Sequence, residues 1–325
     1  MILSKWQSMA ISAAAQLGVA DELASGPKTP TEIAAKIDVK PDALYRLMRA
    51  NAGAGVFREL PDGRFEQTEL SEPLRSDAPD SVRAMAMMLL EDWHHASWGQ
   101  LPWCVKTGKP GSLNVYGKIL FDLMQEHPEK GVNFNKAMTQ MSVPQAAGII
   151  AAYDFSGFQH IVDIAGGHGY LLAEILKGAP NLRGSLFELP HIVEGARAGE
   201  YLPSLGERVG YAPGSFFEDA PPPADAYIMK FIIHDWDDER AGKILNQCRS
   251  VIQSGGKLLV ADMVVPVGNE PAFSKLIDVE MLVQAPGGKE RTEEEFRDLL
   301  AASGFKLERV IPTSTPMCIV EAVPV

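Results

Sequence analysis

The sequence predicts an α/β protein in two parts: a helical, winged-helix domain over residues 1–150 and a Rossmann-like, doubly wound sheet over residues 151–325. Three observations predict this class. A chain of 325 residues exceeds one average domain. Helical periodicity dominates its first half. From about residue 160, apolar β-branched runs alternate with helical runs and glycines stand at the junctions, which is typical of a parallel sheet covered by helices.

The composition is that of a globular chain with an acidic balance. Hydrophobic residues make up 46% and charged residues 22%, which excludes disordered and collagen-like proteins. The net charge of -12 disfavours a general nucleic-acid partner. The three cysteines show neither metal-site nor disulfide-framework spacing, so we expect a reducing, cytoplasmic location. The sequence contains no uninterrupted apolar window of about 18 residues, so we expect no membrane span.

The first helices carry clear boundary signals. Residues 29–32 read Thr-Pro-Thr-Glu, a capping box with proline at the first helical position. A second apolar periodicity over Leu44–Met48 predicts the next helix after a tight turn. The runs Val56–Leu60 and Arg64–Thr68 then flank Pro61-Asp62-Gly63 and predict a hairpin. Helix, turn, helix and hairpin together predict a winged helix.

A winged helix indicates either DNA binding or dimerisation. Its second helix enters the major groove in many DNA-binding proteins. Residues 1–100, however, contain ten basic and fourteen acidic side chains, the wrong balance for phosphate contacts. The charge therefore favours a dimerisation module, and a DNA-binding regulator is kept as the alternative.

Bulky apolar residues recur at helical spacing over residues 84–150. Such residues form either plain core or the wall of a pocket for a flat aromatic ligand. The candidates for the pocket wall, including one from later in the chain, are Trp93, Phe121, Met124, Phe134, Met138 and Met281.

Six strands are predicted in the second half. The last two leave no room for a helix between them, so we expect an antiparallel hairpin at the sheet edge. The predicted strands are His160–Ile164, Leu186–Glu188, Ala226–Met229, Lys257–Ala261, Arg309–Ile311 and Met317–Ala322.

A glycine loop, Ala165–Gly169, joins the first of these strands to a helical run. A dinucleotide-binding fingerprint needs a third glycine where Leu172 stands, which weakens a pyrophosphate interpretation. Glu188 ends the next strand about twenty residues on, where a carboxylate can accept both hydroxyls of a ribose. A solvated acid at a strand end is the alternative for Glu188.

Four segments in this order resemble one known family: Val162–Gly169, Leu186–Pro190, Met229–Trp236 and Gly287–Thr292. The chain is similar, over nearly its whole length, to S-adenosylmethionine-dependent O-methyltransferases of the plant caffeic acid and isoflavone type, with hydroxyindole O-methyltransferase and bacterial natural-product enzymes as relatives. The resemblance implies methyl transfer to a small phenolic or hydroxylated aromatic compound by a homodimer. The acidic charge and the lack of a long apolar window already disfavour a nucleic-acid or membrane partner, and we expect no metal. A decarboxylation or hydroxylation on the same fold is the alternative reaction.

The resemblance also implies which residues hold the cofactor. Its methionine end is assigned to Gly166, Gly167 and Gly169, its ribose to Glu188, its adenine to Ser215 and Phe216, and its polar tail to Lys230; Asp163, Ala165, Leu189 and Gly214 complete the set. Four positions depart from the common family pattern: Ala165 is found where glycine is common, Glu188 and Ser215 where aspartate is common, and Asp262 where glutamate is common. Ser215 puts the adenine contact in doubt, because a hydroxyl lacks a carboxylate's charge.

His234 is the candidate general base. It follows the apolar strand Ala226 to Ile233, so we expect it at the carboxyl end of a parallel strand, where open sheets bind ligands. A histidine that merely caps the next helix is the alternative. The resemblance gives it Asp262 and Glu290 as partners; a strand-end acid and a salt bridge to Lys289 or Arg291 are their ordinary interpretations.

Three acids follow this histidine closely: Asp235, Asp237 and Asp238. Clustered carboxylates are typical of magnesium sites. Acids in a first helical turn also cap the helix and complement its dipole, and an apolar helical face follows from Ala241. We therefore expect helix-capping acids and no metal.

Overall fold

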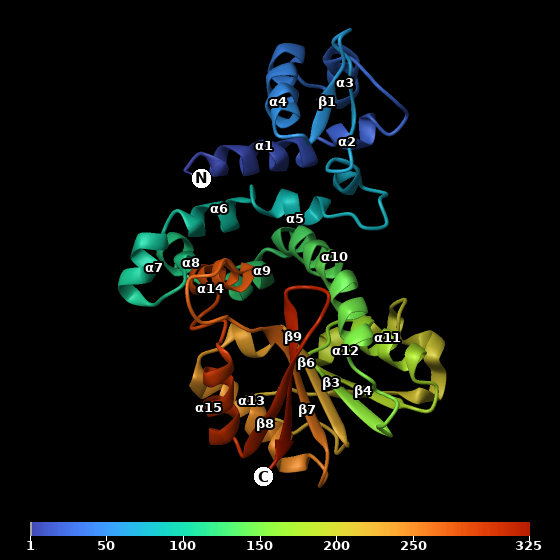
Figure 1. Cartoon of the computed structure of the whole chain (residues 1–325), viewed down its shortest axis with the longest axis vertical. Coiled ribbons are helices and arrows are strands. Elements are labelled where there is room, and N and C mark those ends of the chain that lie inside the picture. The colour runs from blue at the N-terminus through green and yellow to red at the C-terminus, as the bar shows by residue number, and fades with distance from the viewer. Residues whose placement is uncertain (1) are drawn as a thin grey trace. The chain divides into compact units, whose positions relative to one another are not determined.

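The computed structural model describes residues 2–325, which form two compact units that interleave along the chain (Figure 1). The first unit comprises residues 2–99 and Leu120–Met141. The second comprises Gln100–Ile119 and Ser142–Val325. The segment from residue 100 to 119 therefore belongs with the sheet that follows it in sequence.

The first unit is mainly helical and contains a small two-stranded sheet. Thr29 and Glu32 form the predicted capping box, and Pro30 opens the helix. The hairpin is present as an antiparallel pair, with Phe57 opposite Gln67. Its elements are α1 (Ser4–Gln16), α2 (Val19–Glu22), α3 (Pro30–Ile37), α4 (Pro41–Gly53), β1 (Phe57–Glu59), β2 (Phe65–Gln67), α5 (Arg83–Met88), α6 (Asp92–Trp98) and α9 (Leu120–Glu126). The long helix α10 (Pro128–Ala152) begins in this unit and ends in the second.

The second unit is built on a seven-stranded sheet of order β5-β4-β3-β6-β7-β9-β8. Strands β3 to β7 pair in parallel, and β9 and β8 form the predicted antiparallel hairpin at one edge. This is the doubly wound α/β sheet that the sequence predicts. The strands are β3 (His160–Ile164), β4 (Arg183–Glu188), β5 (Val209–Pro213), β6 (Ala226–Lys230), β7 (Lys257–Met263), β8 (Phe305–Pro312) and β9 (Met317–Pro324).

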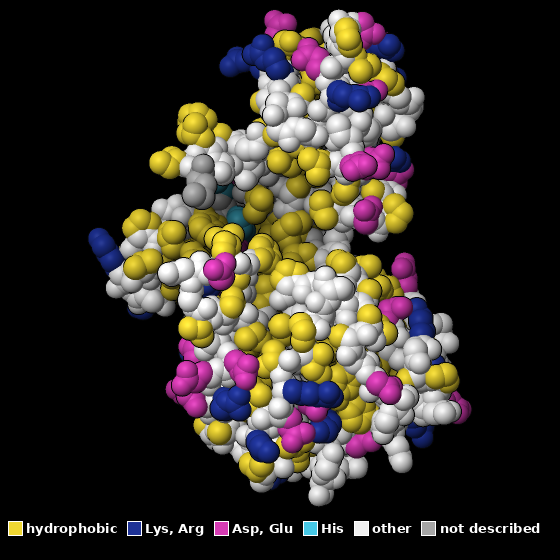
Figure 2. All heavy atoms as spheres, in the orientation of Figure 1, with side chains coloured by type: hydrophobic (Ala, Val, Ile, Leu, Met, Phe, Trp, Pro, Cys, Tyr) yellow, Lys and Arg dark blue, Asp and Glu magenta, His cyan; other side chains and the backbone are white. Residues whose placement is uncertain are grey.

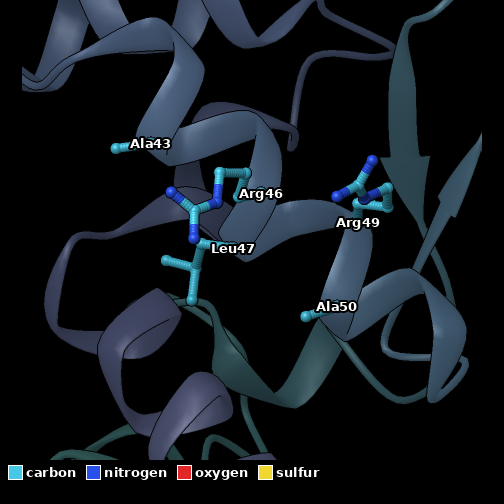
Figure 3. A pocket seen from close by; sticks show the side chains of 5 residues that line it. All are labelled: Ala43, Arg46, Leu47, Arg49 and Ala50. Atoms are coloured by element: carbon cyan, nitrogen blue, oxygen red, sulfur yellow. The ribbon is translucent and has the colours of Figure 1, made fainter.

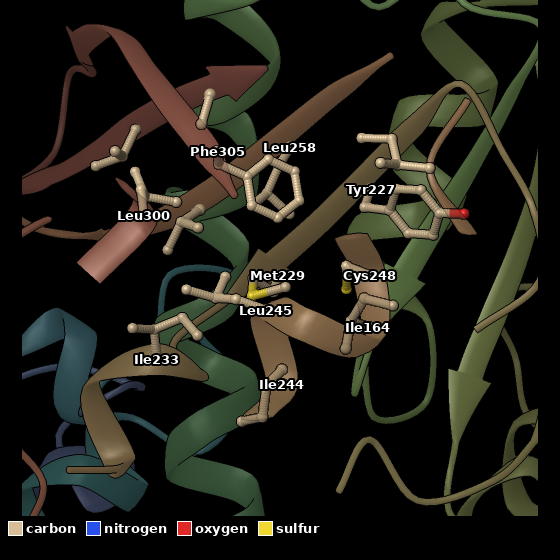
Figure 4. Close-up of a cluster of buried hydrophobic side chains, with 14 of the residues drawn as sticks. Ile164, Tyr227, Met229, Ile233, Ile244, Leu245, Cys248, Leu258, Leu300 and Phe305 are labelled. Carbon is tan, nitrogen blue, oxygen red and sulfur yellow. The ribbon is translucent and has the colours of Figure 1, made fainter. Parts of the chain in front are cut away.

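Helices cover both faces of this sheet and bury an apolar core on each. One core joins the sheet to α13 and α15 and contains Tyr227, Met229 and Leu245 (Figure 4). The other joins the sheet to α10, α11 and α12. The remaining helices of this unit are α7 (Leu101–Thr107), α8 (Gly111–Tyr116), α11 (Tyr170–Gly178), α12 (Pro190–Ala198), α13 (Asp238–Val251), α14 (Phe273–Gln284) and α15 (Glu293–Ala302).

Strands β4 and β8 are longer than predicted, and two further strands differ more from the sequence prediction. Strand β5 was not predicted, because this half-buried edge strand contains Gly210 and Pro213, residue types that are depleted in strands. Strand β6 ends at Lys230 and does not continue to Ile233. Phe231 adopts a left-handed conformation with φ 56°, and Ile233–Asp235 form a 3₁₀ turn.

Candidate active site

The carboxyl ends of β3 and β6 lie side by side at the centre of the sheet. The two strands pair in parallel, with β4 and β5 continuing on one side and β7 on the other. The strand order reverses between β3 and β6, and open α/β sheets bind ligands in the crevice outside the carboxyl ends of the strands at such a point. The chain leaves both strands through a left-handed residue that is not glycine: Ala165 with φ 53° and Phe231 with φ 56°.

The loop after β3 is shaped by residues without side chains. Gly167 and Gly169 have φ values of 59° and 82°, which favour glycine. A Cβ atom on Gly166 would overlap the Asp163 carboxyl group, and one on Gly169 would overlap Leu202. The loop therefore tolerates no side chain at Gly166 or Gly169, and its backbone can approach a ligand closely.

Glu188 ties the end of β4 to this loop. Its carboxylate accepts hydrogen bonds from the Leu189 N–H at 2.7 Å and the Gly167 N–H at 3.2 Å. Burial raises the pKa of Glu188, and these bonds oppose that shift. The side chain is thus a half-buried, bound acid rather than a freely solvated one.

Asp163 and Lys230 are buried ionisable groups at the same strand ends. Neither carboxyl oxygen of Asp163 has a hydrogen-bond partner among the described residues, and burial raises the pKa of Asp163 to about 7. Lys230 Nζ donates to Ser142 Oγ at 3.1 Å. Burial lowers the pKa of Lys230 against the attraction of Asp163 and Asp262. Buried polar groups with unused hydrogen-bonding capacity are suited to a polar ligand.

The segment after β5 closes on the same strand ends. Gly214 donates its N–H to the Glu188 carbonyl at 3.0 Å. The Ser215 N–H donates to Asp219 Oδ2 at 2.9 Å, so a carboxylate stands near the position where the family pattern has one. The next residue belongs to a cluster of edge-packed rings, whose members are Phe216, Phe217 and Trp236.

His234 lies in the 3₁₀ turn after β6 and is enclosed by polar and aromatic groups. Its Nδ1 is 2.8 Å from Glu290 Oε1, and its Nε2 is 3.5 Å from Asp235 Oδ1. The ring of Phe231 stacks on the imidazole with a centroid separation of 4.8 Å. Asp262 is fully buried, and neither of its oxygens has a hydrogen-bond partner among the described residues.

The carboxylates around His234 favour its protonated form. Burial alone would lower the pKa of His234, but Asp235, Glu290 and Asp262 together raise it to about 9. Burial raises the pKa of Asp262 to about 7, although the charge of His234 opposes this shift. Burial likewise raises the pKa of Asp235. The cluster is therefore a site where a positive charge on the imidazole is strongly stabilised.

The acids after His234 have different surroundings. Asp237 Oδ1 accepts the Arg240 N–H at 2.9 Å and caps α13, as predicted. Asp235 does not cap the helix, because its carboxylate lies against His234. Asp238 forms ion pairs with Lys289 and Arg291. Within residues 2–325, no three acidic, histidine or cysteine side chains gather as metal ligands would.

Three residues at this cluster were not predicted. Phe231 stacks on His234, and Asp278 Oδ1 accepts the Glu290 N–H at 2.9 Å. Arg291 is completely buried and pairs with Asp238, so the alternative of an ion pair between Glu290 and Arg291 was wrong. Only the position of Arg291 beside Glu290 could have indicated its importance from sequence.

The aromatic candidates of the first unit form a connected row. Trp93 packs edge to face on Phe134 at 5.9 Å, and Phe134 packs on Phe121 at 6.4 Å. Trp93 is 2% exposed, which fits the plain-core interpretation, whereas Phe121 is 43% exposed. Met124 and Met138 belong to the same unit and Met281 to the second unit. Contact of these six residues with an acceptor stays a prediction.

A hollow on α4 contains none of the predicted site residues. It is lined by Ala43, Arg46, Leu47, Arg49 and Ala50 (Figure 3). Acidic and basic side chains are interspersed on the face of the molecule that Figure 2 shows, without one large basic patch. Within residues 2–325, no helix combines the length and apolar character needed to cross a bilayer.

Comparison with protein families gives two matches. Residues 98–306 match the O-methyltransferase domain, and residues 1–77 match the O-methyltransferase dimerisation domain.

Individual relatives match over almost the whole chain. Phenazine O-methyltransferase PhzM of Lysobacter antibioticus is 41% identical over 100% of this chain and 95% of its own length. The mitomycin biosynthesis 6-O-methyltransferase of Streptomyces lavendulae is 38% identical over 97% of this chain and 90% of its own. A crystal structure of an O-methyltransferase from neocarzinostatin biosynthesis, in complex with S-adenosylmethionine and 2-hydroxy-5-methyl naphthoic acid, superposes with a TM-score of 0.83 at 30% identity, covering 98% of this chain and 96% of that one.

Proposed function

The chain belongs to the O-methyltransferase family, and we propose that it transfers a methyl group from S-adenosylmethionine to a hydroxyl of a small phenolic or hydroxylated aromatic compound, with His234 as the general base. The observation that carries this proposal is the buried contact of 2.8 Å between His234 Nδ1 and Glu290 Oε1. When the imidazole is neutral, this contact keeps the proton on Nδ1, and Nε2, which lies 3.5 Å from Asp235 Oδ1, is the nitrogen that accepts a proton at the carboxyl end of the sheet, where ligands of such folds bind.

The residues at the strand ends fit S-adenosylmethionine. When bound, this cofactor supplies a methyl group, carried on a positively charged sulfur, to a nucleophilic oxygen and becomes S-adenosylhomocysteine. The unpartnered carboxyl group of Asp163 suits its cationic parts, and the Lys230 ammonium suits its carboxylate. Glu188, already oriented by two backbone N–H groups, suits the ribose hydroxyls. The full set that we assign to the cofactor is Asp163, Ala165, Gly166, Gly167, Gly169, Glu188, Leu189, Gly214, Ser215, Phe216 and Lys230.

The base is needed because a phenol is a weak nucleophile until its proton leaves. With a phenolic pKa of about 10, the phenolate lies roughly 4 kcal/mol uphill at pH 7. In the proposal, the hydroxyl proton passes to Nε2 of His234 while Nδ1–H keeps donating to Glu290 Oε1. The raised pKa of His234, about 9, means that the imidazolium formed in this step is well stabilised.

Two carboxylates hold the imidazole ready for this transfer. Glu290 fixes the tautomer with the proton on Nδ1, as the orienting acid of a catalytic triad does. Asp262 lies buried at the end of β7 and stabilises the imidazolium through its charge. We therefore propose His234, Glu290 and Asp262 as the groups that act in proton transfer.

The acceptor and the assembly rest on the relatives. Their names include phenazine and mitomycin, and one crystal complex holds a hydroxylated naphthoic acid. We infer an aromatic acceptor of that size class. The match of residues 1–77 to a dimerisation domain supports a homodimer, which light scattering of the purified chain measures directly.

Replacing the base tests the proposal. We expect His234→Asn to bind S-adenosylhomocysteine as the wild type does and to lose about 10²- to 10⁴-fold of the turnover number, the usual contribution of a general base. The measurement is methyl incorporation from S-adenosylmethionine into a panel of phenols, hydroxyphenazines and hydroxynaphthoic acids. His160→Asn is the matched control, because His160 contacts Ser185 at the start of β3. Undiminished turnover in His234→Asn would remove His234 from its role.

A further inference from the structure

We infer that Arg291 is a positioning residue for His234. Its side chain fixes the turn that carries the imidazole, and its backbone fixes that turn to the strand end that carries Asp262. The inference rests on the proposed role of His234 as the base and adds a residue that touches neither the imidazole nor a ligand.

The guanidinium of Arg291 binds the turn on both sides of His234. Nη1 donates to the Ile233 carbonyl at 3.0 Å, and Nη2 donates to the Trp236 carbonyl at 2.9 Å. The first carbonyl directly precedes His234, and the second lies two residues after it. Two donors of one rigid plane therefore set the height and tilt of the segment from which the imidazole projects.

Asp238 anchors this guanidinium at the start of α13. Its Oδ1 accepts from Nη2 at 2.7 Å and from Nε at 3.1 Å. The pair neutralises a cation whose side chain is completely buried, whereas the Asp238 side chain is 58% exposed. The turn, the helix that follows it and Arg291 are thus one hydrogen-bonded unit.

The backbone around Arg291 connects the turn to the two acids near His234, Asp262 and Glu290. The Arg291 carbonyl accepts the Val265 N–H at 2.9 Å, just beyond the end of β7 and three residues after Asp262. The Lys289 N–H donates to the His234 carbonyl at 2.8 Å. Glu290, between these two, is thereby held at Nδ1 of His234.

A lysine cannot replace this fork. Its ammonium is a single point of charge on a flexible stem, so it cannot hold the Asp238 carboxylate and two separate carbonyls in one plane. We expect the turn in Arg291→Lys to keep its charge balance but lose its fixed orientation. The contact between His234 Nδ1 and Glu290 Oε1 should then loosen.

The test compares Arg291→Lys with Arg249→Lys in the full-length chain. Arg249 lies in α13 and donates to the carbonyls of Gly304 and Val325, so it is a carbonyl-binding arginine outside the His234 cluster. The first readout is the imidazole Nδ1–H signal in the ¹⁵N-histidine NMR spectrum with S-adenosylhomocysteine bound, assigned with His234→Asn. The second is the affinity for S-adenosylhomocysteine by calorimetry. The third is kcat and KM for any phenol of the panel that the wild type methylates.

We expect Arg291→Lys to lose or broaden the Nδ1–H signal and to keep the affinity for S-adenosylhomocysteine within about threefold, with kcat lower by about 100-fold and KM little changed. Arg249→Lys should keep all three. If Arg291→Lys matches Arg249→Lys in signal and kcat, the inference is overturned. Loss of S-adenosylhomocysteine binding together with the signal overturns it as well, because the role is then general folding.

Asp238→Asn covers the case in which Arg291→Lys does not fold. It keeps the guanidinium and both carbonyl contacts but weakens their anchor, so we expect a partial loss of kcat and a broadened Nδ1–H signal; an unchanged variant contradicts the inference. A wild type that methylates no acceptor in the panel defeats the proposed function, whereas the NMR comparison still decides the role of Arg291.

Discussion

The loop after β3 and the turn after β6 both lead the chain away from a strand end at the candidate site, but they present different groups there. Both begin with a left-handed residue whose N–H donates to the neighbouring strand, Ala165 to the Phe187 carbonyl at 2.8 Å and Phe231 to the Ala261 carbonyl at 3.1 Å. The first then presents backbone through glycines, and the second presents His234, held by distant side chains. A ligand gripped by main chain needs space, whereas a base needs orientation.

The largest effect on cofactor affinity should come from filling the space in the first loop. In Gly166→Ala, the new Cβ collides with the buried Asp163 carboxyl group. Overpacking of this kind costs about 1–3 kcal/mol. The free protein can relieve it by shifting the loop, whereas binding requires the loop to return to its tight shape, so we expect affinity for S-adenosylhomocysteine to fall by about 10- to 100-fold. Isothermal calorimetry measures this loss.

Gly167→Ala is the matched control for that change. Nothing lies within 4 Å of a Cβ at Gly167, and only its φ of 59° opposes alanine. Its loss should be clearly smaller. Equal losses in the two variants would show that backbone conformation, and not space, dominates this loop.

A change of pH should separate the loop from the turn. The pKa of His234 is raised to about 9, so its neutral, proton-accepting form increases as the pH rises toward that value. We expect kcat at saturating S-adenosylmethionine to rise by about tenfold between pH 8 and 10. The affinity for S-adenosylhomocysteine should not rise with it, because burial lowers the pKa of Lys230 and the amino group of the ligand also loses its proton in this range. Ionisation of the acceptor could also raise kcat with pH. The pH profile of His234→Asn separates the two causes, because it should lack the rise in kcat that comes from the imidazole.

Deprotonation of His234, which should raise kcat, should lower the stability of the fold. Because the folded-state pKa of His234 lies above its ordinary value, its protonation stabilises the fold, and that contribution is lost as the pH rises through about 9. The melting temperature should therefore decrease from pH 7 to 10, and by less in His234→Asn. A wild-type kcat that is flat over this range contradicts the assignment.

The smallest effect should come from relieving the backbone at the start of the loop. Alanine with φ 53° costs about 1–2 kcal/mol, most of which Ala165→Gly recovers against roughly 0.5–1 kcal/mol of added backbone entropy. We expect a melting temperature higher by at most a few degrees and an unchanged affinity for S-adenosylhomocysteine. A tenfold weaker affinity would show that the alanine methyl group itself contacts the cofactor.

The contrast also explains what sequence could predict. Alternating strands and helices, the capping box at Thr29 and the glycine loop are local patterns, and the structure contains all of them. Strand β5 escaped because Gly210 and Pro213 hide its periodicity. The surroundings of His234 were predicted less well. The guanidinium of Arg291 binds Ile233, Trp236 and Asp238, which lie more than fifty residues away in sequence, and no local pattern marks these contacts.

The account's central claim is that His234 removes the acceptor's proton. The ratio of wild-type to His234→Asn turnover, measured across phenols of decreasing pKa, tests it most directly. At a pH of about 8.5, we predict a ratio of about 10²–10⁴ for phenols with an ordinary pKa of about 10; for 4-nitrophenol, whose nitro group makes it largely ionised at that pH, we predict a ratio near one. A ratio that stays constant along the series would contradict the claim.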